Sequence, residues 1–208
     1  MDFLEVVQGR RSIRRFKPNP LPRKDIEEII RIATLAPSAS NRQMWRFIAI
    51  SNKDVLLRMR AVVEQAIEDM TRIPELARER PKILGFKSFS VFMADAPMVI
   101  AVCGEPYRSS TDELRLLHGL PVEPGRAWAR PDIQSISAAV QNLTLAAYYK
   151  GYGTVWMTSP LIAASELEKI LRIREPWRLV TLVPIGIPDE RPGMRSRKPV
   201  EEVLQFIE

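Results

Sequence analysis

The order of helical and strand patterns along the chain constrains its fold more than any other feature. Strands are predicted where segments are rich in β-branched and aromatic residues or are uniformly apolar. Helices are predicted where apolar residues recur at helical spacing. The predicted strands are WRFIAIS (45–51), PMVIAVC (97–103), YGTVWMTS (152–159) and RLVTLVPIGIP (178–188). The predicted helices cover residues 2–9, 24–35, 53–70, 132–150, 163–172 and 200–207. Because helices and strands do not alternate strictly, the pattern favours an α+β fold of packed layers over a doubly wound parallel sheet.

The helix predicted over residues 132–150 is expected to be central to the molecule. It has one apolar stripe, made of Ile133, Ile136, Val140, Leu143 and Ala147. Alanines beside the stripe allow neighbouring elements to approach closely. A helix with so little charge in its interior belongs either in a core or in a subunit interface, and the sequence leaves both interpretations open.

Length and composition indicate an ordinary globular protein. The chain has 208 residues, of which 46% are hydrophobic and 27% charged, and we expect a single domain over residues 1–208. No apolar run approaches the roughly 18 residues that a membrane helix needs. The N-terminal MDFLEVVQGRR places acidic and apolar residues before its arginines, which is the reverse of a signal peptide. We therefore expect a cytoplasmic protein with no membrane partner.

The scarce residue types exclude several classes of chemistry. Cys103 is the only cysteine, so the chain has no internal disulfide and no cysteine-based zinc site. Its apolar surroundings favour a small buried side chain over a nucleophile. His118 is the only histidine, and its setting, RLLHGLPVEPG, is typical of a surface loop. A Ser-His-Asp or Cys-His hydrolase is therefore disfavoured, and we expect no metal site.

Two arginine-rich segments, one near each end of the chain, could hold an anion. They contribute Arg10, Arg11, Arg14 and Arg15 from RRSIRRFKPNP (10–20), and Arg195, Arg197 and Lys198 from RSRK. No phosphate loop of the form GxxxxGK[ST] is present, so a bound phosphate would depend on arginines, whose guanidinium groups bind it through two parallel hydrogen bonds. If the two segments meet, they form one cationic pocket, to which Ser12 adds a hydroxyl. If they do not, both are solvated surface segments. Residue spacing alone does not decide between these alternatives.

The positive charge also raises the possibility of a nucleic-acid partner. The net charge is +6 and the isoelectric point is about 9.7, a moderate excess that suits an anionic small ligand equally well. Recognition helices, aromatic RNA-binding motifs and zinc ligands are all absent from the sequence. We expect no nucleic-acid partner.

Both ends of the sequence resemble the FMN-dependent nitroreductase family. The resemblance rests on RRSIRRF followed by LPRKDIEEIIRIATLAPSASNRQMWRF, and on AAVQNLTLAAYYKGYGTVWMTSP, LVPIGIPDE and RSRKPVEEVL. It covers residues 1–51 and 132–208, whereas residues 52–131 match only in general layout. Separated motifs in the same order are much more specific than any one of them. The resemblance implies a mainly antiparallel sheet flanked by helices, in an intertwined homodimer with FMN bound at the subunit interface.

The resemblance also implies which residues contact the flavin. Arg10, Ser12, Arg195 and Arg197 match the ligands of the ribityl phosphate, with Arg11 beside them, and Arg14 matches a cation near the flavin N1–O2 edge. Pro37, Ser38, Ala39 and Asn41 resemble the segment that reaches the flavin from the partner subunit. Thr158 and Ser159 fall where a backbone N–H faces flavin N5. Such a site needs no catalytic side chain, because the flavin itself carries the hydride.

The activity implied is hydride transfer from NAD(P)H to flavin N5 and then to an electron-poor acceptor such as a nitroaromatic or a quinone, with ping-pong kinetics. Two alternatives remain open. One is a flavin-binding sensor or storage protein without significant NAD(P)H turnover. The other is a specialised member of the family, such as a reductive dehalogenase or a benzimidazole synthase, although such members differ from the N-x-Q pattern at Asn41 to Gln43. The long connection at 104–131 has the turn residues of a functional loop. The physiological substrate and the preference for NADH or NADPH are not indicated.

Overall fold

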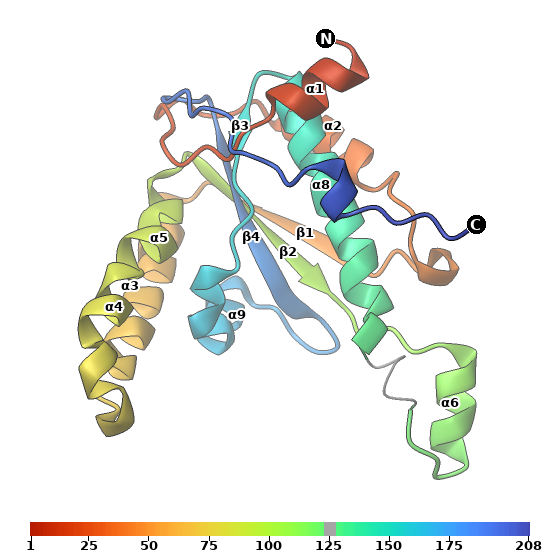
Figure 1. The fold of residues 1–208 in the computed structure, drawn as a ribbon. Helices are drawn as coiled ribbons and strands as arrows, with labels where there is room; N and C mark the ends of the chain where they lie inside the picture. Colours follow the sequence, from red (N-terminus) through yellow and green to blue (C-terminus); the bar gives the residue numbers. More distant parts are fainter. Residues whose placement is uncertain (123–127) are drawn as a thin grey trace.

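A four-stranded antiparallel sheet lies at the centre of the computed structural model, which describes residues 1–122 and 128–208 (Figure 1). Its strands are β1 (Trp45–Ile50), β2 (Met98–Gly104), β3 (Gly153–Thr154) and β4 (Arg178–Gly186). They lie in the order β1-β2-β4-β3, and every neighbouring pair is antiparallel. Together with the surrounding helices, this arrangement confirms the predicted α+β class.

Helices cover both faces of this sheet (Figure 1). On one face lie α2 (Arg23–Ala33) and α8 (Pro131–Tyr149), and on the other lie α3 (Lys53–Met70) and α9 (Ala164–Leu171). Strand β2 shows the consequence, because successive side chains of a strand point to opposite faces. Ile100 and Val102 pack in the core under α2 and α8, whereas Val99 and Ala101 pack in the core under α3 and α9. This two-sided burial explains why the strand is apolar at every position.

The question that the sequence left open about the central helix is answered by its packing. Ile136, Val140 and Leu143 are at most 1% exposed and belong to the core beneath α2 and α8. The strand approaches the helix so closely that a Cβ placed on Gly104 would lie 2.3 Å from Ile136 Cδ1. The apolar stripe of α8 is therefore buried within its own chain from Ile136 onward, whereas Ile133 is partly exposed.

Residues 71–122 contain more helix than the sequence predicts. The short helices α4 (Arg80–Gly85) and α5 (Lys87–Val91) follow a 3₁₀ turn at Pro74–Glu79, and a further 3₁₀ turn spans Phe92–Asp95. Helix α6 (Ser110–Leu117) forms within the segment predicted as a long loop, and its Ser109 cap accepts a hydrogen bond from the Asp112 N–H. The part of that predicted loop at 123–127 lies outside the described residues. His118 ends α6 and is exposed, as expected.

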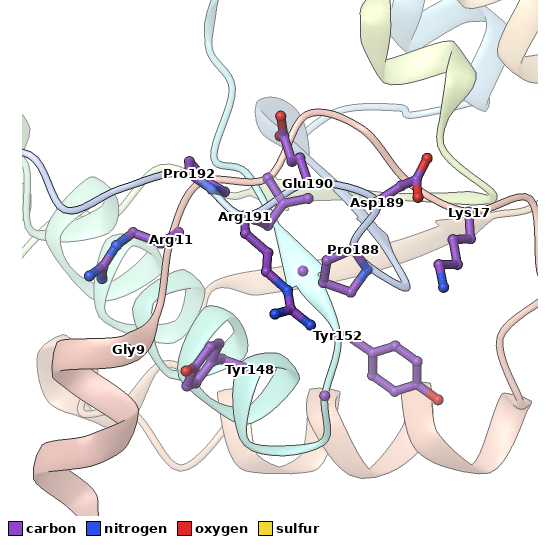
Figure 2. A pocket seen from close by; sticks show the side chains of 13 residues that line it. Gly9, Arg11, Lys17, Tyr148, Tyr152, Pro188, Asp189, Glu190, Arg191 and Pro192 are labelled. Atoms are coloured by element: carbon purple, nitrogen blue, oxygen red, sulfur yellow. The ribbon is translucent and has the colours of Figure 1, made fainter.

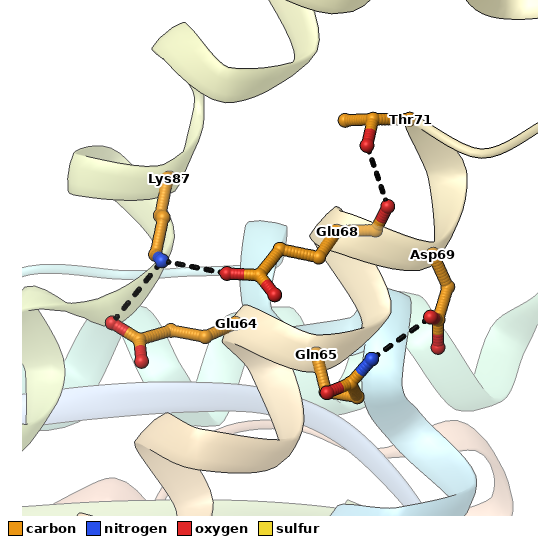
Figure 3. A network of polar contacts seen from close by, with 6 residues as sticks. All are labelled: Glu64, Gln65, Glu68, Asp69, Thr71 and Lys87. Atoms are coloured by element: carbon orange, nitrogen blue, oxygen red, sulfur yellow. Dashed lines mark hydrogen bonds and ion pairs between the residues drawn. The ribbon is translucent and has the colours of Figure 1, made fainter.

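A polar network attaches α5 to the long helix α3 (Figure 3). The Lys87 ammonium lies 3.1 Å from Glu68 Oε1 and 3.9 Å from Glu64 Oε1. Glu64 and Glu68 are one helical turn apart, so both carboxylates lie on the same face of α3. The network holds α5 at a fixed position beside the 3₁₀ turn at Ser159–Ala163, where Ser159 Oγ donates to the Phe89 carbonyl at 3.3 Å.

Two predicted elements are shorter in the structure. The strand expected at 152–159 pairs regularly only over Gly153–Thr154, with one isolated bridge between Met157 and Leu182. The helix predicted at 200–207 is wrong, because only Val200–Glu202 forms a 3₁₀ turn. Its apolar side chains have no surface of their own chain to pack against, and Phe206 and Ile207 are 78% and 92% exposed. Tertiary packing supplies most of the stability of a helix, so this segment stays extended.

Helix α1 (Phe3–Gly9) forms as predicted, with a reciprocal capping box between Asp2 and Glu5. Only Val6 on it is buried, whereas Phe3 is 72% exposed. Cys103 is fully buried in the sheet, which confirms its expected structural role, and burial raises the pKa of its thiol to about 11. None of the described helices is long and apolar enough to cross a membrane.

Candidate cofactor site

The basic segment after α1 is extended and adds to the edge of the sheet beside β3. Ser12 and Thr154 form a parallel bridge, and the Ile13 N–H donates to the Thr154 carbonyl at 3.0 Å. Further along, the Lys17 N–H donates to the Ile187 carbonyl at 2.9 Å. The segment is therefore held by backbone hydrogen bonds to two parts of the C-terminal half of the chain. Because successive side chains of an extended segment point in opposite directions, its arginines are divided between two faces.

Glu190 fixes the same segment from the C-terminal side. Its carboxylate accepts hydrogen bonds from the backbone N–H groups of Arg14 and Arg15, and Arg15 Nε lies 3.5 Å from it. Burial alone would raise the pKa of the Glu190 carboxyl, but these hydrogen bonds and the charge of Arg15 outweigh it and lower the pKa. Glu190 therefore stays ionised, and its carboxylate binds the backbone N–H groups of Arg14 and Arg15.

The two arginine clusters lie close enough to interact. The pKa of Arg10 is lowered by burial of its guanidinium, and then by the positive charges of Arg11 and Arg197. The tail around Arg197 is extended. The Arg197 guanidinium donates to the carbonyls of Arg195 and Ser196, both at 3.1 Å. Arg197 thus lies near enough to Arg10 for their like charges to repel, while the side chains of Arg195 and Arg197 are exposed. Repulsion among these cations leaves Arg10 in a position that a bound anion would stabilise.

Arg11 lies differently from Arg10. Its guanidinium donates to the carbonyls of Gln8 at 2.6 Å and Arg10 at 2.8 Å, at the end of α1 and just beyond it. It also lines a cavity of about 700 Å³ together with Ile13, whereas Ser12 and Arg14 do not (Figure 2). The alternation of an extended segment explains this division. Arg14 is exposed, and its guanidinium lies 3.4 Å from the Ser12 carbonyl.

The segment at 37–41 is a constrained turn far from the basic segment of the same chain. Ser40 and Asn41 both have positive φ angles, 53° and 51°. The Ala39 N–H donates to Ser135 Oγ at 3.1 Å, and the Ser38 hydroxyl accepts from the Gln43 N–H at 3.0 Å. These bonds hold the turn against the first part of α8, with the exposed Pro37 and Asn41 directed outward. The turn is thus a rigid surface feature with a defined position.

Thr158 and Ser159 lie exposed at the end of the segment that follows β3. Met157 precedes them and is fixed by hydrogen bonds with Leu182 in both directions, at 2.9 and 3.0 Å. The 3₁₀ turn Ser159–Ala163 starts here with Thr158 as its cap. Backbone N–H groups that open a helical turn have no partner inside that turn. They can therefore donate to a polar edge of a ligand.

A polar network that sequence reasoning missed holds α2 against the end of α8. Lys150 Nζ lies 2.7 Å from Glu28 Oε2 and 3.0 Å from Asp25 Oδ1, and the Tyr152 hydroxyl donates to Asp25 at 2.5 Å. Burial and the hydrogen bond to Asp25 raise the pKa of Tyr152 to about 12. These residues are distant in sequence and belong to no local motif, so only the tertiary structure reveals the network. In the part of the chain that the structure describes, no cluster of His, Cys, Asp or Glu could hold a metal ion.

Replacing Gly153 by alanine tests how tightly the basic segment is seated. A Cβ at this position would lie 2.6 Å from Ile13 Cγ1 and 2.8 Å from Ile13 Cβ. Because Ile13 Cβ cannot move without its backbone, we expect Gly153→Ala to lower the free energy of unfolding by about 1–3 kcal/mol, measured by urea denaturation. Gly85→Ala is the control, since no atom lies within 4 Å of its Cβ position, and it is expected to be neutral or slightly stabilising. Equal stability of the two variants would show that the segment is not packed against β3.

Comparisons with known proteins identify the family of the chain. The model of the Nitroreductase family matches residues 7–187. A protein of Methanothermobacter thermautotrophicus with the provisional name NADH dehydrogenase/NAD(P)H nitroreductase is 30% identical over 198 residues, which cover 94% of this chain and 82% of that protein. An iodotyrosine deiodinase of Hydra vulgaris is 27% identical over 209 residues, covering 98% of this chain and 72% of that protein. The crystal structure of a BluB-like flavoprotein from Clostridium difficile 630 matches with a TM-score of 0.89 and 28% identity, and the match covers 100% of both chains.

Proposed function

Because the chain belongs to the nitroreductase family, we propose that it is an FMN-dependent oxidoreductase. It takes hydride from NAD(P)H and passes it to an electron-poor acceptor such as a nitroaromatic or a quinone. The observation that carries the proposal is the seating of the basic segment at the sheet edge, where the Ile13 N–H donates to the Thr154 carbonyl at 3.0 Å, with the charge of Arg197 acting on Arg10. The similar flavoprotein of Clostridium difficile and the relative with the nitroreductase name support it.

The residues of this chain fit the phosphate of FMN. A phosphate monoester carries close to two negative charges at neutral pH, and Arg10 is held among like charges that such an anion would neutralise. In our proposal Arg10, Arg195 and Arg197 bind the phosphate, and the Ser12 hydroxyl donates to it. Glu190 does not oppose this binding, because Arg15 and two backbone N–H groups already surround its carboxylate.

The remaining predicted residues orient the ring of the cofactor. When bound, FMN supplies the hydride chemistry, accepting hydride from the nicotinamide and delivering it to the acceptor. Arg14 provides a cation beside the N1–O2 edge, where negative charge on the reduced ring would be stabilised. The backbone N–H groups at Thr158 and Ser159 donate toward the N5 edge. These roles require no acid, base or nucleophile from the protein.

The position of the turn at 37–41 supports a site shared between two copies of the chain. The turn binds to α8 at Ser135. The basic segment follows directly after Gly9, whose Cβ position is 2.1 Å from the hydroxyl oxygen of Tyr148 at the other end of the helix. At 1.5 Å per residue these points are about 20 Å apart along α8. We propose that Pro37, Ser38, Ala39 and Asn41 contact the cofactor held by the partner subunit. The exposed apolar side chains of α1 and the C-terminal tail would be buried in this homodimer.

The proposal is tested by the visible absorption spectrum of the purified protein. The protein is saturated with FMN, freed of excess cofactor, and then treated with NADH or NADPH without oxygen. We expect the flavin absorption bands to remain with the protein and to bleach when the nicotinamide is added. Reoxidation by a nitroaromatic or a quinone would complete the cycle, and parallel lines in double-reciprocal plots would show ping-pong kinetics. Failure to retain FMN would refute the proposal.

A second candidate activity is reductive dehalogenation. The similarity to iodotyrosine deiodinase over 98% of this chain favours it. The reduced protein is therefore also offered 3-iodotyrosine, and release of iodide with reoxidation of the flavin would identify the specialised activity. If the flavin stays bound but its absorption bands do not bleach with either nicotinamide, the protein is instead a flavin-binding sensor or storage protein.

A further inference from the structure

The cavity on the opposite face of the basic segment has the features of a second ligand site. Its volume is about 700 Å³, within the range of sites for small molecules. It is bounded by the segment at Gly9–Ile13, by the end of α8 with the loop that follows it, and by residues 188–192 (Figure 2). Arg11 and Ile13 line it, whereas Arg10, Ser12 and Arg14 are not among its lining residues. The extended segment therefore separates this cavity from the proposed phosphate site of FMN.

Two cations at this cavity have no partner among the residues that the structure describes. Arg191 extends its guanidinium into the cavity toward Tyr148 and Tyr152, and Lys17 lies at its edge (Figure 2). Within residues 1–122 and 128–208, neither the guanidinium of Arg191 nor the ammonium of Lys17 makes a hydrogen bond or an ion pair. Arg11 differs, because its guanidinium is occupied by two backbone carbonyls.

The acidic residues of the cavity do not pair with Arg191. Glu190 accepts hydrogen bonds from two backbone N–H groups and pairs with Arg15. The carboxylates of Asp189 and Glu190 both point away from the guanidinium of Arg191 (Figure 2). The part of the cavity around the Arg191 guanidinium is therefore positive, and an anion is the ligand that its charge favours there.

Two tyrosine rings form fixed walls of the same cavity. The Tyr152 hydroxyl donates to Asp25 at 2.5 Å, which anchors the ring from its outer end. Tyr148 packs against Gly9 so closely that any side chain at residue 9 would collide with it. Rings that are already ordered contribute contact area at little cost in conformational entropy. They suit a ligand that has a planar aromatic group as well as a negative charge.

We propose that this cavity binds a phosphorylated nucleoside, with the phosphate on Arg191 and Lys17 and the base against Tyr148 or Tyr152. The site is additional to the proposed FMN site. Its ligand is either a free nucleotide or the adenosine phosphate part of a nicotinamide dinucleotide, since both present the same chemistry.

The test uses protein saturated with FMN and adenosine 5′-monophosphate as the probe, with binding measured by calorimetry. We expect one site per chain, with adenosine alone and inorganic phosphate each binding at least about tenfold more weakly. Arg191→Gln is expected to weaken binding of the probe by about tenfold or more, because it removes hydrogen bonds to a charged group. Arg174→Gln is the matched control, since Arg174 is exposed elsewhere, and it is expected to leave binding unchanged. Both variants should keep their FMN.

Several results would overturn the proposal: no binding of the probe, binding of inorganic phosphate as tight as that of the nucleotide, equal losses in the two variants, or release of FMN by the probe. The last result would place the nucleotide at the arginines of the FMN site. A higher KM for NADH or NADPH in Arg191→Gln would identify the dinucleotide as the ligand, and an unchanged KM with loss of probe binding would identify a free nucleotide. Probe binding is measured a second time on protein without FMN. Failure of the nucleotide site is then distinguished from failure of the proposed oxidoreductase activity.

Discussion

Replacing Arg10 by glutamine is expected to reduce the affinity for FMN by about 100-fold or more. A hydrogen bond to a charged group contributes about 1.5–3 kcal/mol, and each 1.4 kcal/mol corresponds to a factor of ten, so the loss of two such bonds to the phosphate produces this effect. The measurement is a titration of apoprotein with FMN. Arg15→Gln makes the same change of charge in the same segment, but Arg15 is 75% exposed and pairs with Glu190, so its effect is expected to be less than about threefold.

Arg10→Gln should not reduce the stability of the protein without cofactor. The fold lowers the pKa of Arg10 through burial and through repulsion by Arg11 and Arg197. A lowered pKa of a basic group means that its charged form is less favourable in the folded state than in the unfolded chain. Arg10→Gln should therefore leave apoprotein stability unchanged or slightly higher in urea denaturation. An apoprotein that is strongly destabilised would show that Arg10 has a structural role, and retention of FMN would contradict the proposed phosphate site.

Replacing Leu143 by alanine is expected to have the largest effect on stability. Its side chain is fully buried in the core between the sheet and helices α2 and α8. Truncation of a buried leucine costs about 2–5 kcal/mol, because apolar contacts are lost and a cavity remains. The free energy of unfolding measures the effect, and Gln141→Ala on the exposed side of the same helix should change it by less than about 0.5 kcal/mol.

The dependence on protein concentration distinguishes a core role from an interface role. Truncation of a side chain that packs within its own chain destabilises each subunit, so the loss of unfolding free energy should be the same at all protein concentrations. If Leu143 acted at a subunit interface instead, the loss would grow as the protein is diluted. A concentration-dependent loss would contradict the packing of α8 described above.

The sequence by itself determined the local elements and most of their chemistry. Helical spacing predicted α2, α3, α8 and α9, and apolar runs predicted β2 and β4 as buried strands, because burial on one or both faces imposes a characteristic residue period. The buried state of Cys103 followed from its neighbours in the same way. The family motifs indicated Arg10, Ser12 and Arg197 as ligands of one group, and these assignments remain predictions, as do the single domain over residues 1–208 and the homodimer.

Only the tertiary structure decided how distant segments combine. Arg10 and Arg197 approach because the basic segment pairs beside β3 and the C-terminal segment returns to the same edge, which no local pattern specifies. The direction of Arg11 follows from that pairing. The contact of Tyr152 with Asp25 and the position of Arg191 likewise join residues that are far apart in the chain. The predicted helix at 200–207 does not form for the same reason, since a short helix depends on a packing surface that this chain alone does not provide. Local periodicity depends on neighbouring residues, whereas a binding site depends on contacts between residues far apart in the chain.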